Sequence, residues 1–196
     1  MSLIKTMTQK WEKICRGNSL FFRLYALPYR KTVRREIELA DIKSEDRILN
    51  IGCGALPFTA YYLALLSGAK VIAVDIDEQA LTGAQKSLGK AAENNDLELE
   101  IKNYSGKQAV ENCDFDVVVA ALQTENKAEI LQHLSHNKPG QSWKFVVREP
   151  RPKFADQYDS LTDSISPADK IKQYFPTFDR SVLYTDKANF NFQEAG

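Results

Sequence analysis

Short apolar runs alternate with segments of helical periodicity along most of this 196-residue chain, and this alternation constrains the fold more than any other feature. The run Asp116–Ala121, for example, has the apolar character of a strand buried on both faces. The expected strands are 47–51, 70–74, 97–102, 116–121 and 143–147, and the expected helices between them are 59–67, 78–90, 108–111 and 125–134. Strands that alternate with helices pair in parallel and carry helices on both faces, so we predict an α/β fold with a doubly wound, mostly parallel sheet.

The first 40 residues read as a helical extension. Helices are expected over 5–16 and 19–40, with Ser19 as an N-cap and Pro28 as a kink or boundary of the second. At this length one main domain is expected. We therefore divide the chain into an N-terminal helical extension, residues 1–40, and one ligand-binding domain, residues 41–196.

The pattern weakens after residue 148. Ser166 and Pro167 predict the start of a helix that reaches about Phe175. Arg180–Tyr184 reads as a late strand, and Phe190–Phe192 as a last, antiparallel edge strand.

Composition is that of a soluble globular protein, with 43% apolar and 27% charged residues. The longest apolar runs, Ala60–Leu66 and Val117–Leu122, fall short of the roughly 18 residues that cross a bilayer. The first residues are interrupted by lysines and do not resemble a signal peptide. The three cysteines are far apart and form no CxxC motif, which favours a reducing cytoplasm as the location.

Charge is unevenly distributed although the net charge is zero. Residues 1–35 hold nine basic residues against the single acid Glu12, a net charge of +8, and the remainder carries −8. Five aromatic residues share this basic arm, which could face RNA or an anionic lipid. The alternative, which we favour, is an amphipathic helix packed on the body with its basic groups in solvent.

The loop after the first strand carries the clearest ligand signal. Gly52 allows a tight turn, and Gly54 removes the side chain that would block a close ligand. Asp75 ends the next strand, where a carboxylate can accept both hydroxyls of a ribose. Pro57 stands where a dinucleotide-binding loop has its third glycine. We therefore expect a nucleoside without a pyrophosphate, namely S-adenosylmethionine (SAM), in preference to NAD(P) or to an empty site.

The segment Val71-Ile-Ala-Val-Asp75-Ile-Asp77 resembles the second motif of class I SAM-dependent methyltransferases, which have a Rossmann-like fold. The resemblance implies that Asp75 binds the ribose, that Ile76 lies beside the adenine and that Asn103 bonds an adenine edge. Asn103 has a second interpretation, a loop residue that satisfies its own turn. The full set of cofactor-binding candidates is Asn50, Gly52, Cys53, Gly54, Asp75, Ile76, Asn103, Tyr104 and Ala120.

Two stretches resemble one branch of this superfamily, the nicotianamine synthases. Ile51-Gly-Cys-Gly-Ala-Leu-Pro-Phe-Thr59 is similar to their I-G-S-G-P-L-P-L-T loop, and the region from Phe115 to Arg148 is more loosely similar to their later motifs. That family moves the aminocarboxypropyl arm of SAM onto an amine and releases methylthioadenosine (MTA). Its catalytic glutamate has no clear match here, since Glu12, Glu36 and Glu38 are merely available.

Several chemistries are disfavoured by what the chain lacks. Ala120-Ala-Leu-Gln123 replaces the N-P-P motif of adenine-N6 and glutamine methyltransferases. Cys53 lies inside the glycine loop, where we interpret it as structural. His133 and His136 have no further ligands near them in sequence, so no metal is expected. No catalytic residue is assigned. Tyr29 is a candidate for closing over the carboxylate of the ligand, and the alternative is that it only packs against its neighbours.

The predicted function is that of a SAM-dependent transferase, in the first place a methyltransferase with a small-molecule acceptor. Three alternatives stay open: aminocarboxypropyl transfer, RNA methylation through the basic arm, and a non-catalytic protein that kept the fold.

Overall fold

The computed structural model describes residues 19–137, 142–161 and 165–187. The helices are α2 (Ser19–Ala40), α3 (Phe58–Ser67), α4 (Glu78–Glu93), α5 (Gly106–Asn112), α6 (Lys127–Asn137) and the 3-10 helix η1 (Pro152–Gln157). The strands are β1 (Arg47–Ile51), β2 (Lys70–Asp75), β3 (Leu99–Asn103), β4 (Val117–Ala120), β5 (Lys144–Pro150), β6 (Asp169–Lys172) and β7 (Phe178–Thr185). Every helix and strand predicted between residues 47 and 147 is confirmed, with ends that differ by a few residues.

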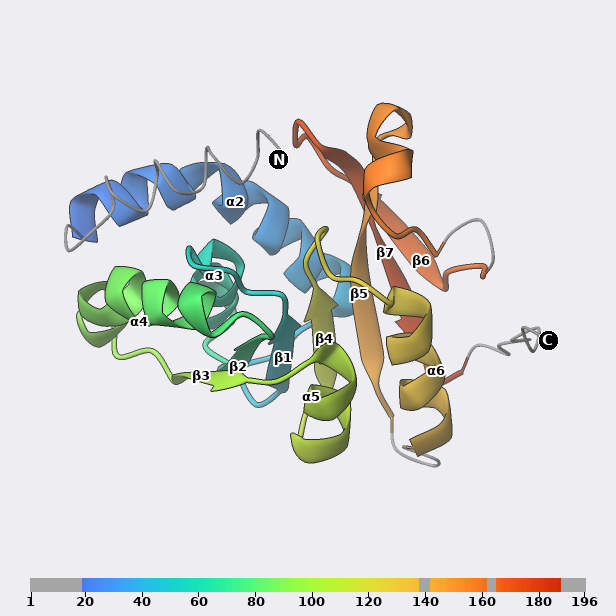
Figure 1. The fold of residues 1–196 in the computed structure, drawn as a ribbon, viewed down its shortest axis with the longest axis horizontal. Coiled ribbons are helices and arrows are strands. Elements are labelled where there is room, and N and C mark those ends of the chain that lie inside the picture. Colours follow the sequence, from blue (N-terminus) through green and yellow to red (C-terminus); the bar gives the residue numbers. More distant parts are fainter. Residues whose placement is uncertain (1–18, 138–141, 162–164, 188–196) are drawn as a thin grey trace.

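The strands form one seven-stranded sheet in the order β3-β2-β1-β4-β5-β7-β6 (Figure 1). Strands β1 to β5 pair in parallel, whereas β7 runs antiparallel to both β5 and β6. The predicted doubly wound, mostly parallel sheet is therefore confirmed. The chain order reverses at β1 and β4, and ligands bind beyond the carboxyl ends of the strands at such a point.

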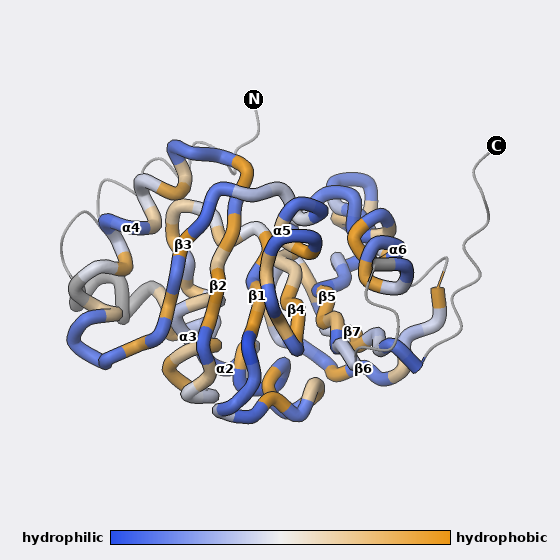
Figure 2. Tube along the Cα trace, turned by 90° about the horizontal axis from the view of Figure 1, so that it is seen from below, coloured by the Kyte–Doolittle hydropathy of each residue, from blue (hydrophilic) through white to orange (hydrophobic). Residues whose placement is uncertain are grey.

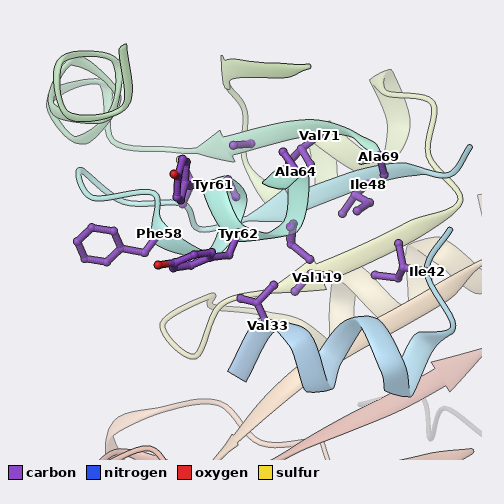
Figure 3. Close-up of a cluster of buried hydrophobic side chains, with 14 of the residues drawn as sticks. Val33, Ile42, Ile48, Phe58, Tyr61, Tyr62, Ala64, Ala69, Val71 and Val119 are labelled. Atoms are coloured by element: carbon purple, nitrogen blue, oxygen red, sulfur yellow. The ribbon is translucent and has the colours of Figure 1, made fainter. Parts of the chain in front are cut away.

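Side chains that alternate along each strand fill two cores, one on each face of the sheet. Ile48, Val71 and Val119 belong to the core under α2, α3 and α4. Val33 of α2, Tyr62 of α3 and Val119 of β4 belong to this core, which Figure 3 shows in close-up. The neighbouring residues Leu49, Ile72 and Val118 face α5 and α6 instead. Figure 2 shows hydrophobic stretches in β1, β2 and β4 and a mainly hydrophilic edge strand β3.

The predicted helix from Ser166 to about Phe175 is wrong, because this segment contains the edge strand β6. Ile171 is half-buried between the exposed Lys170 and Lys172, which is the alternation of a strand. Ladder bonds to β7 outweigh the local Ser-Pro helix signal, and Ala168 N already donates to the Leu183 carbonyl at 2.8 Å.

The N-terminal helix α2 is part of the packed structure. It runs from Ser19 to Ala40 through Pro28, and Ala26, Val33 and Ala40 on its inner face are buried. The helix predicted over 5–16 and the strand predicted at 190–192 lie outside the described residues. Within the described ranges, none of the helices is both long enough and apolar enough to span a membrane.

Candidate functional site

The glycine loop connects β1 to α3 and bends back over the end of β2. The backbone amides of Gly52 and Cys53 both donate to the Val74 carbonyl, at 2.9 and 3.0 Å. Gly52 has a φ of +76° and Gly54 a φ of +63°, a left-handed conformation that favours glycine. Apart from Gly54 itself and its two chain neighbours, no described residue has an atom within 4 Å of the place where a Cβ on Gly54 would stand. The loop therefore exposes bare backbone at its tip, as the sequence predicted.

Asp75, at the end of β2, faces this loop. Its Oδ2 accepts from the Gly54 amide at 2.8 Å, and its Oδ1 accepts from the Asp77 amide at 3.0 Å. A carboxylate offers about four acceptor positions, so two remain for a ligand. The side chain is half-buried. Asp75 thus both holds the loop and keeps acceptor capacity at its tip.

Two further candidates lie next to Asp75. Ile76 is 75% exposed, which is unusual for a large apolar side chain. Asn103 donates from Nδ2 to the carbonyls of Asp75 and Ile76, at 3.1 and 3.2 Å. Asn103 therefore pins the turn that carries Ile76, and these bonds use its amide nitrogen rather than Oδ1.

Of the remaining cofactor candidates, Asn50 and Ala120 are buried and Tyr104 is half-buried. Asn50 is fully buried in β1, where its Nδ2 donates to the Val119 carbonyl at 3.0 Å. Among the described residues, its Oδ1 is the one buried side-chain oxygen or nitrogen for which the structure shows no hydrogen-bond partner. Ala120 is buried at the end of β4, and Tyr104 packs against the core under α5 and α6.

Cys53 is buried in the loop, as its structural interpretation predicts. Burial, reinforced by the neighbouring Asp75 carboxylate, raises the pKa of the Cys53 thiol to about 12. Since the thiolate is the nucleophilic form of cysteine, this side chain is unsuited to covalent catalysis.

The sequence reasoning missed two supports of the loop. Thr124, after β4, donates to the Ile51 carbonyl at 3.1 Å, and its Oγ1 would lie only 2.8 Å from a Cβ on Gly52. On the other side a Cβ on Gly83 of α4 would come within 2.9 Å of Ala55 Cβ. The loop is therefore held between the β4–α6 connection and α4. Ser87, one turn after Gly83 in α4, donates from Oγ to the Ala55 carbonyl at 3.0 Å. Two small residues one turn apart on a helix are the sequence signal that could have indicated this contact.

Helix α2 brings Tyr29 to the beginning of α3. Its ring lies 5.4 Å from that of Phe58 and 4.8 Å from that of Phe175, measured between centroids. Burial raises the pKa of Tyr29, although the nearby Arg148 charge opposes the shift. The Tyr29 hydroxyl therefore stays protonated at neutral pH and can donate a hydrogen bond.

A buried ion pair lies behind this aromatic contact. Arg148 of β5 donates from Nε and one terminal nitrogen to the two carboxylate oxygens of Glu36 in α2, both at 2.8 Å. The other terminal nitrogen donates to Thr59 Oγ1 at 3.1 Å. Arg148 is 3% exposed and Glu36 0% exposed. Glu36 was one of three glutamates available in the sequence, but nothing there indicated its partner.

The two histidines of α6 have different neighbours in the described structure. His133 is near the carboxylates of Glu111 and Glu129, at 3.7 and 3.9 Å, and His136 contacts the Gln132 carbonyl at 2.8 Å. In the part of the chain that the structure describes, three His, Cys, Asp or Glu side chains nowhere gather in a metal-binding group.

The sheet order with its antiparallel β7, together with the glycine loop and the aspartate after β2, defines a class I methyltransferase-like Rossmann fold. Residues 49–139 match the methyltransferase-domain family. The structure is similar to that of MtNAS, a nicotianamine synthase, in complex with SAM, with a TM-score of 0.74 and 19% identity over 91% of this chain and 71% of that one. A structure of MtNAS with MTA and tNA gives a TM-score of 0.73. The predicted resemblance to SAM-dependent methyltransferases, and to the nicotianamine synthase branch in particular, is thereby confirmed for the fold.

Curated relatives match shorter stretches. An L-histidine 2-aminobutanoyltransferase of Pseudomonas aeruginosa is 41% identical over 56 residues, 29% of this chain and 21% of that protein. A ribosomal protein L11 methyltransferase of Thermotoga neapolitana is 31% identical over 94 residues, 48% of this chain and 33% of that protein. These matches span at most a third of either relative. An RNA methyltransferase of Salinibacter ruber, solved with S-adenosylhomocysteine (SAH), is a more distant structural neighbour, with a TM-score of 0.55 and 20% identity over 79% of this chain and 90% of that one.

Proposed function

We propose that the chain binds SAM in the crevice formed by the glycine loop and Asp75, and that it transfers the aminocarboxypropyl arm of SAM to an amine. The observation that carries the binding site is the pairing of Gly54 with Asp75. The loop tip is open at the Cβ position of Gly54, and the carboxylate beside it has acceptor positions to spare.

The residues around this pair fit an adenosine group. Asp75 would accept from the ribose hydroxyls, which is how folds of this kind hold nucleosides. Ile76 would lose its unfavourable exposure against the adenine face. Asn103 keeps its carbonyl oxygen for the adenine amino group, while its amide nitrogen fixes the turn. The buried Asn50 Oδ1 needs a hydrogen-bond donor, which an ordered water or the ligand would supply.

The choice of the aminocarboxypropyl group is supported by helix α2. Tyr29 of this helix contacts Phe58 at the beginning of α3, and Glu36 pairs with Arg148 of β5, which also bonds Thr59 of α3, so that α2 is held beside the loop end of the proposed site. The MtNAS match covers 91% of the chain, whereas the RNA methyltransferase match covers 79%. A curated relative that is 41% identical over 56 residues is named as an L-histidine 2-aminobutanoyltransferase. A free amino acid is therefore the acceptor class that we propose.

When bound, SAM supplies an electrophilic γ-carbon next to a positively charged sulfur. The amine lone pair forms the new C–N bond, the C–S bond breaks, its electron pair goes to sulfur, and neutral MTA leaves. A free amino acid carries its amine as an ammonium at neutral pH, so one proton passes to bulk solvent before the attack, and the secondary ammonium that forms keeps the two remaining protons. The protein needs only to align donor and acceptor and to exclude water. Tyr29, whose hydroxyl stays protonated, would donate a hydrogen bond to the carboxylate of the aminocarboxypropyl arm. Cys53 would take no part in the reaction.

Methyl transfer is the second candidate, because residues 49–139 match the methyltransferase-domain family and because one relative is an L11 methyltransferase. RNA as the acceptor rests only on the basic residues of the N-terminal segment, of which Arg30, Lys31 and Arg34 are exposed on α2.

The products of turnover test the proposal. The full chain would be incubated with SAM and a panel of amino acids that includes L-histidine, and the nucleoside products separated by chromatography. Acceptor-dependent release of MTA supports aminocarboxypropyl transfer. Release of SAH supports methyl transfer instead, and SAM binding without either product contradicts both enzymatic proposals. The Asp75→Ala variant serves as the control, since at SAM concentrations below saturation it should release the same product at least about tenfold more slowly.

A further inference from the structure

The buried ion pair of Arg148 and Glu36 belongs to a larger polar network inside the otherwise apolar core under α2. Glu36 Oε1 also accepts from Ser181 Oγ of β7 at 2.8 Å, and Gln173 Nε2 donates to Ser181 Oγ at 3.1 Å. Gln173 further donates to the Thr32 carbonyl of α2 at 3.3 Å. The network therefore joins α2 to α3, β5 and β7.

Such a network is an inefficient way to gain stability. Removing two charges from water costs several kcal/mol per ion, which the attraction between them roughly repays only when the geometry is good. Apolar residues of similar volume would stabilise this core about as well. A role in placing its neighbours is therefore the better explanation of the pair.

The position of Thr59 indicates what is being placed. Thr59 lies in the first turn of α3, directly after the glycine loop, and Arg148 holds it by its hydroxyl. The residue before α3 is Pro57, which gives the helix no side-chain cap in the described structure. An uncapped helix N-terminus attracts a carboxylate. The same turn carries Phe58, which Tyr29 of α2 contacts.

We propose that Arg148 is a positioning residue: paired with Glu36, it holds the first turn of α3 and helix α2 in the arrangement that receives the aminocarboxypropyl arm of the ligand. The proposal rests on the proposed SAM site and specifies which part of the ligand depends on the network. Ribose and adenine, which lie toward Asp75 and Ile76, do not depend on it.

Comparing two ligands separates positioning from simple stability. SAH carries the aminocarboxypropyl arm and MTA lacks it, while both carry the same thioadenosine. The test uses the double variant Glu36→Leu with Arg148→Met, which removes both buried charges together and so avoids leaving one unpaired. The measurements are calorimetric dissociation constants for SAH and MTA and the thermal midpoint of the full chain.

We expect the double variant to melt within a few degrees of the parent chain. It should bind SAH at least about fivefold more weakly, since one lost hydrogen bond is worth roughly 1 kcal/mol. Its affinity for MTA should stay within about twofold of that of the parent. Thr59→Val, which keeps the ion pair and removes only the hydroxyl, should weaken SAH binding in the same selective way. It also provides the test if the double variant does not fold.

The control is Phe115→Leu, a change in the core on the opposite face of the sheet. It should lower the melting temperature and leave the ratio of SAH to MTA affinity unchanged. The inference is overturned if both variants of the network bind SAH and MTA as the parent does, or lose affinity for both equally. If the parent chain binds neither ligand, the proposed function itself fails, and this inference fails with it.

Discussion

Replacing Gly54 by alanine probes the proposed ligand crevice with the smallest possible side chain. Gly54 has a φ of +63°, and a non-glycine residue in this conformation costs about 1–2 kcal/mol. Restricting the unfolded chain returns about 0.4–1 kcal/mol, so the net destabilisation should be on the order of 1 kcal/mol. For a chain of this length that lowers the melting temperature by about 2–4 °C. Since no described residue beyond the two chain neighbours has an atom within 4 Å of the new Cβ, the fold has room for it.

The ligand does not have that room, because the added methyl group would stand where the nucleoside approaches the loop. We expect the affinity for SAH to fall at least about tenfold, or about 1.4 kcal/mol. Gly89→Ala in α4 is the matched control, because its Cβ also meets open space but its φ is ordinary. That change should stabilise the chain by about 0.5–1 kcal/mol and leave SAH affinity unchanged. Parent-like SAH binding by Gly54→Ala, measured by calorimetry, would refute the placement of the ligand against this loop.

Two other predictions follow from ionisable groups. Burial raises the pKa of the Cys53 thiol to about 12, so this thiol should resist iodoacetamide at pH 8 in the native chain and react after denaturation. Peptide mass spectrometry would detect the label, and rapid labelling of the native chain would contradict the prediction. Burial of Asp116 opposes ionisation, but hydrogen bonds from Arg47 prevail and lower the pKa of this carboxyl. The ionised carboxylate therefore stabilises the fold at pH values above its unfolded pKa of about 3.9. This stabilisation is lost as the pH falls through the lowered pKa of the folded state. Asp116→Asn should therefore reduce the free energy of unfolding at pH 7, and the difference from the parent should shrink toward pH 2; a difference independent of pH would disprove the contribution.

The central part of the fold could be predicted because each element there has its own local signal. Runs such as Val117–Ala120 are buried on both faces and read as strands from composition alone. Gly68 directly follows α3 in a left-handed conformation, and a glycine at the end of a helical pattern is a local stop signal. The segment around β6 could not be predicted, because it forms a strand only through its bonds to β7, and a Ser-Pro pair favours a helix when those bonds are ignored.

The candidate site divides in the same way. Gly52, Gly54 and Asp75 follow from the alternation of strand and loop, and the structure brings them together as expected. The Glu36–Arg148 pair could not be predicted, because its members are 112 residues apart and no local pattern links them. Asn103 is an intermediate case. The predicted strand 97–102 ends one residue before it, whereas in the structure Asn103 is the last residue of β3. Its bonds to the Asp75–Ile76 turn depend on the register of β2 and β3.

The most direct test of the central claim is calorimetric titration of the full chain and of its Asp75→Ala variant with SAH. We predict saturable binding by the parent and an affinity at least about 1.5 kcal/mol weaker in the variant, the worth of a charge-assisted hydrogen bond. Equal affinities for the two proteins, or no binding heat from the parent at all, would contradict the assignment of this crevice to an adenosyl ligand.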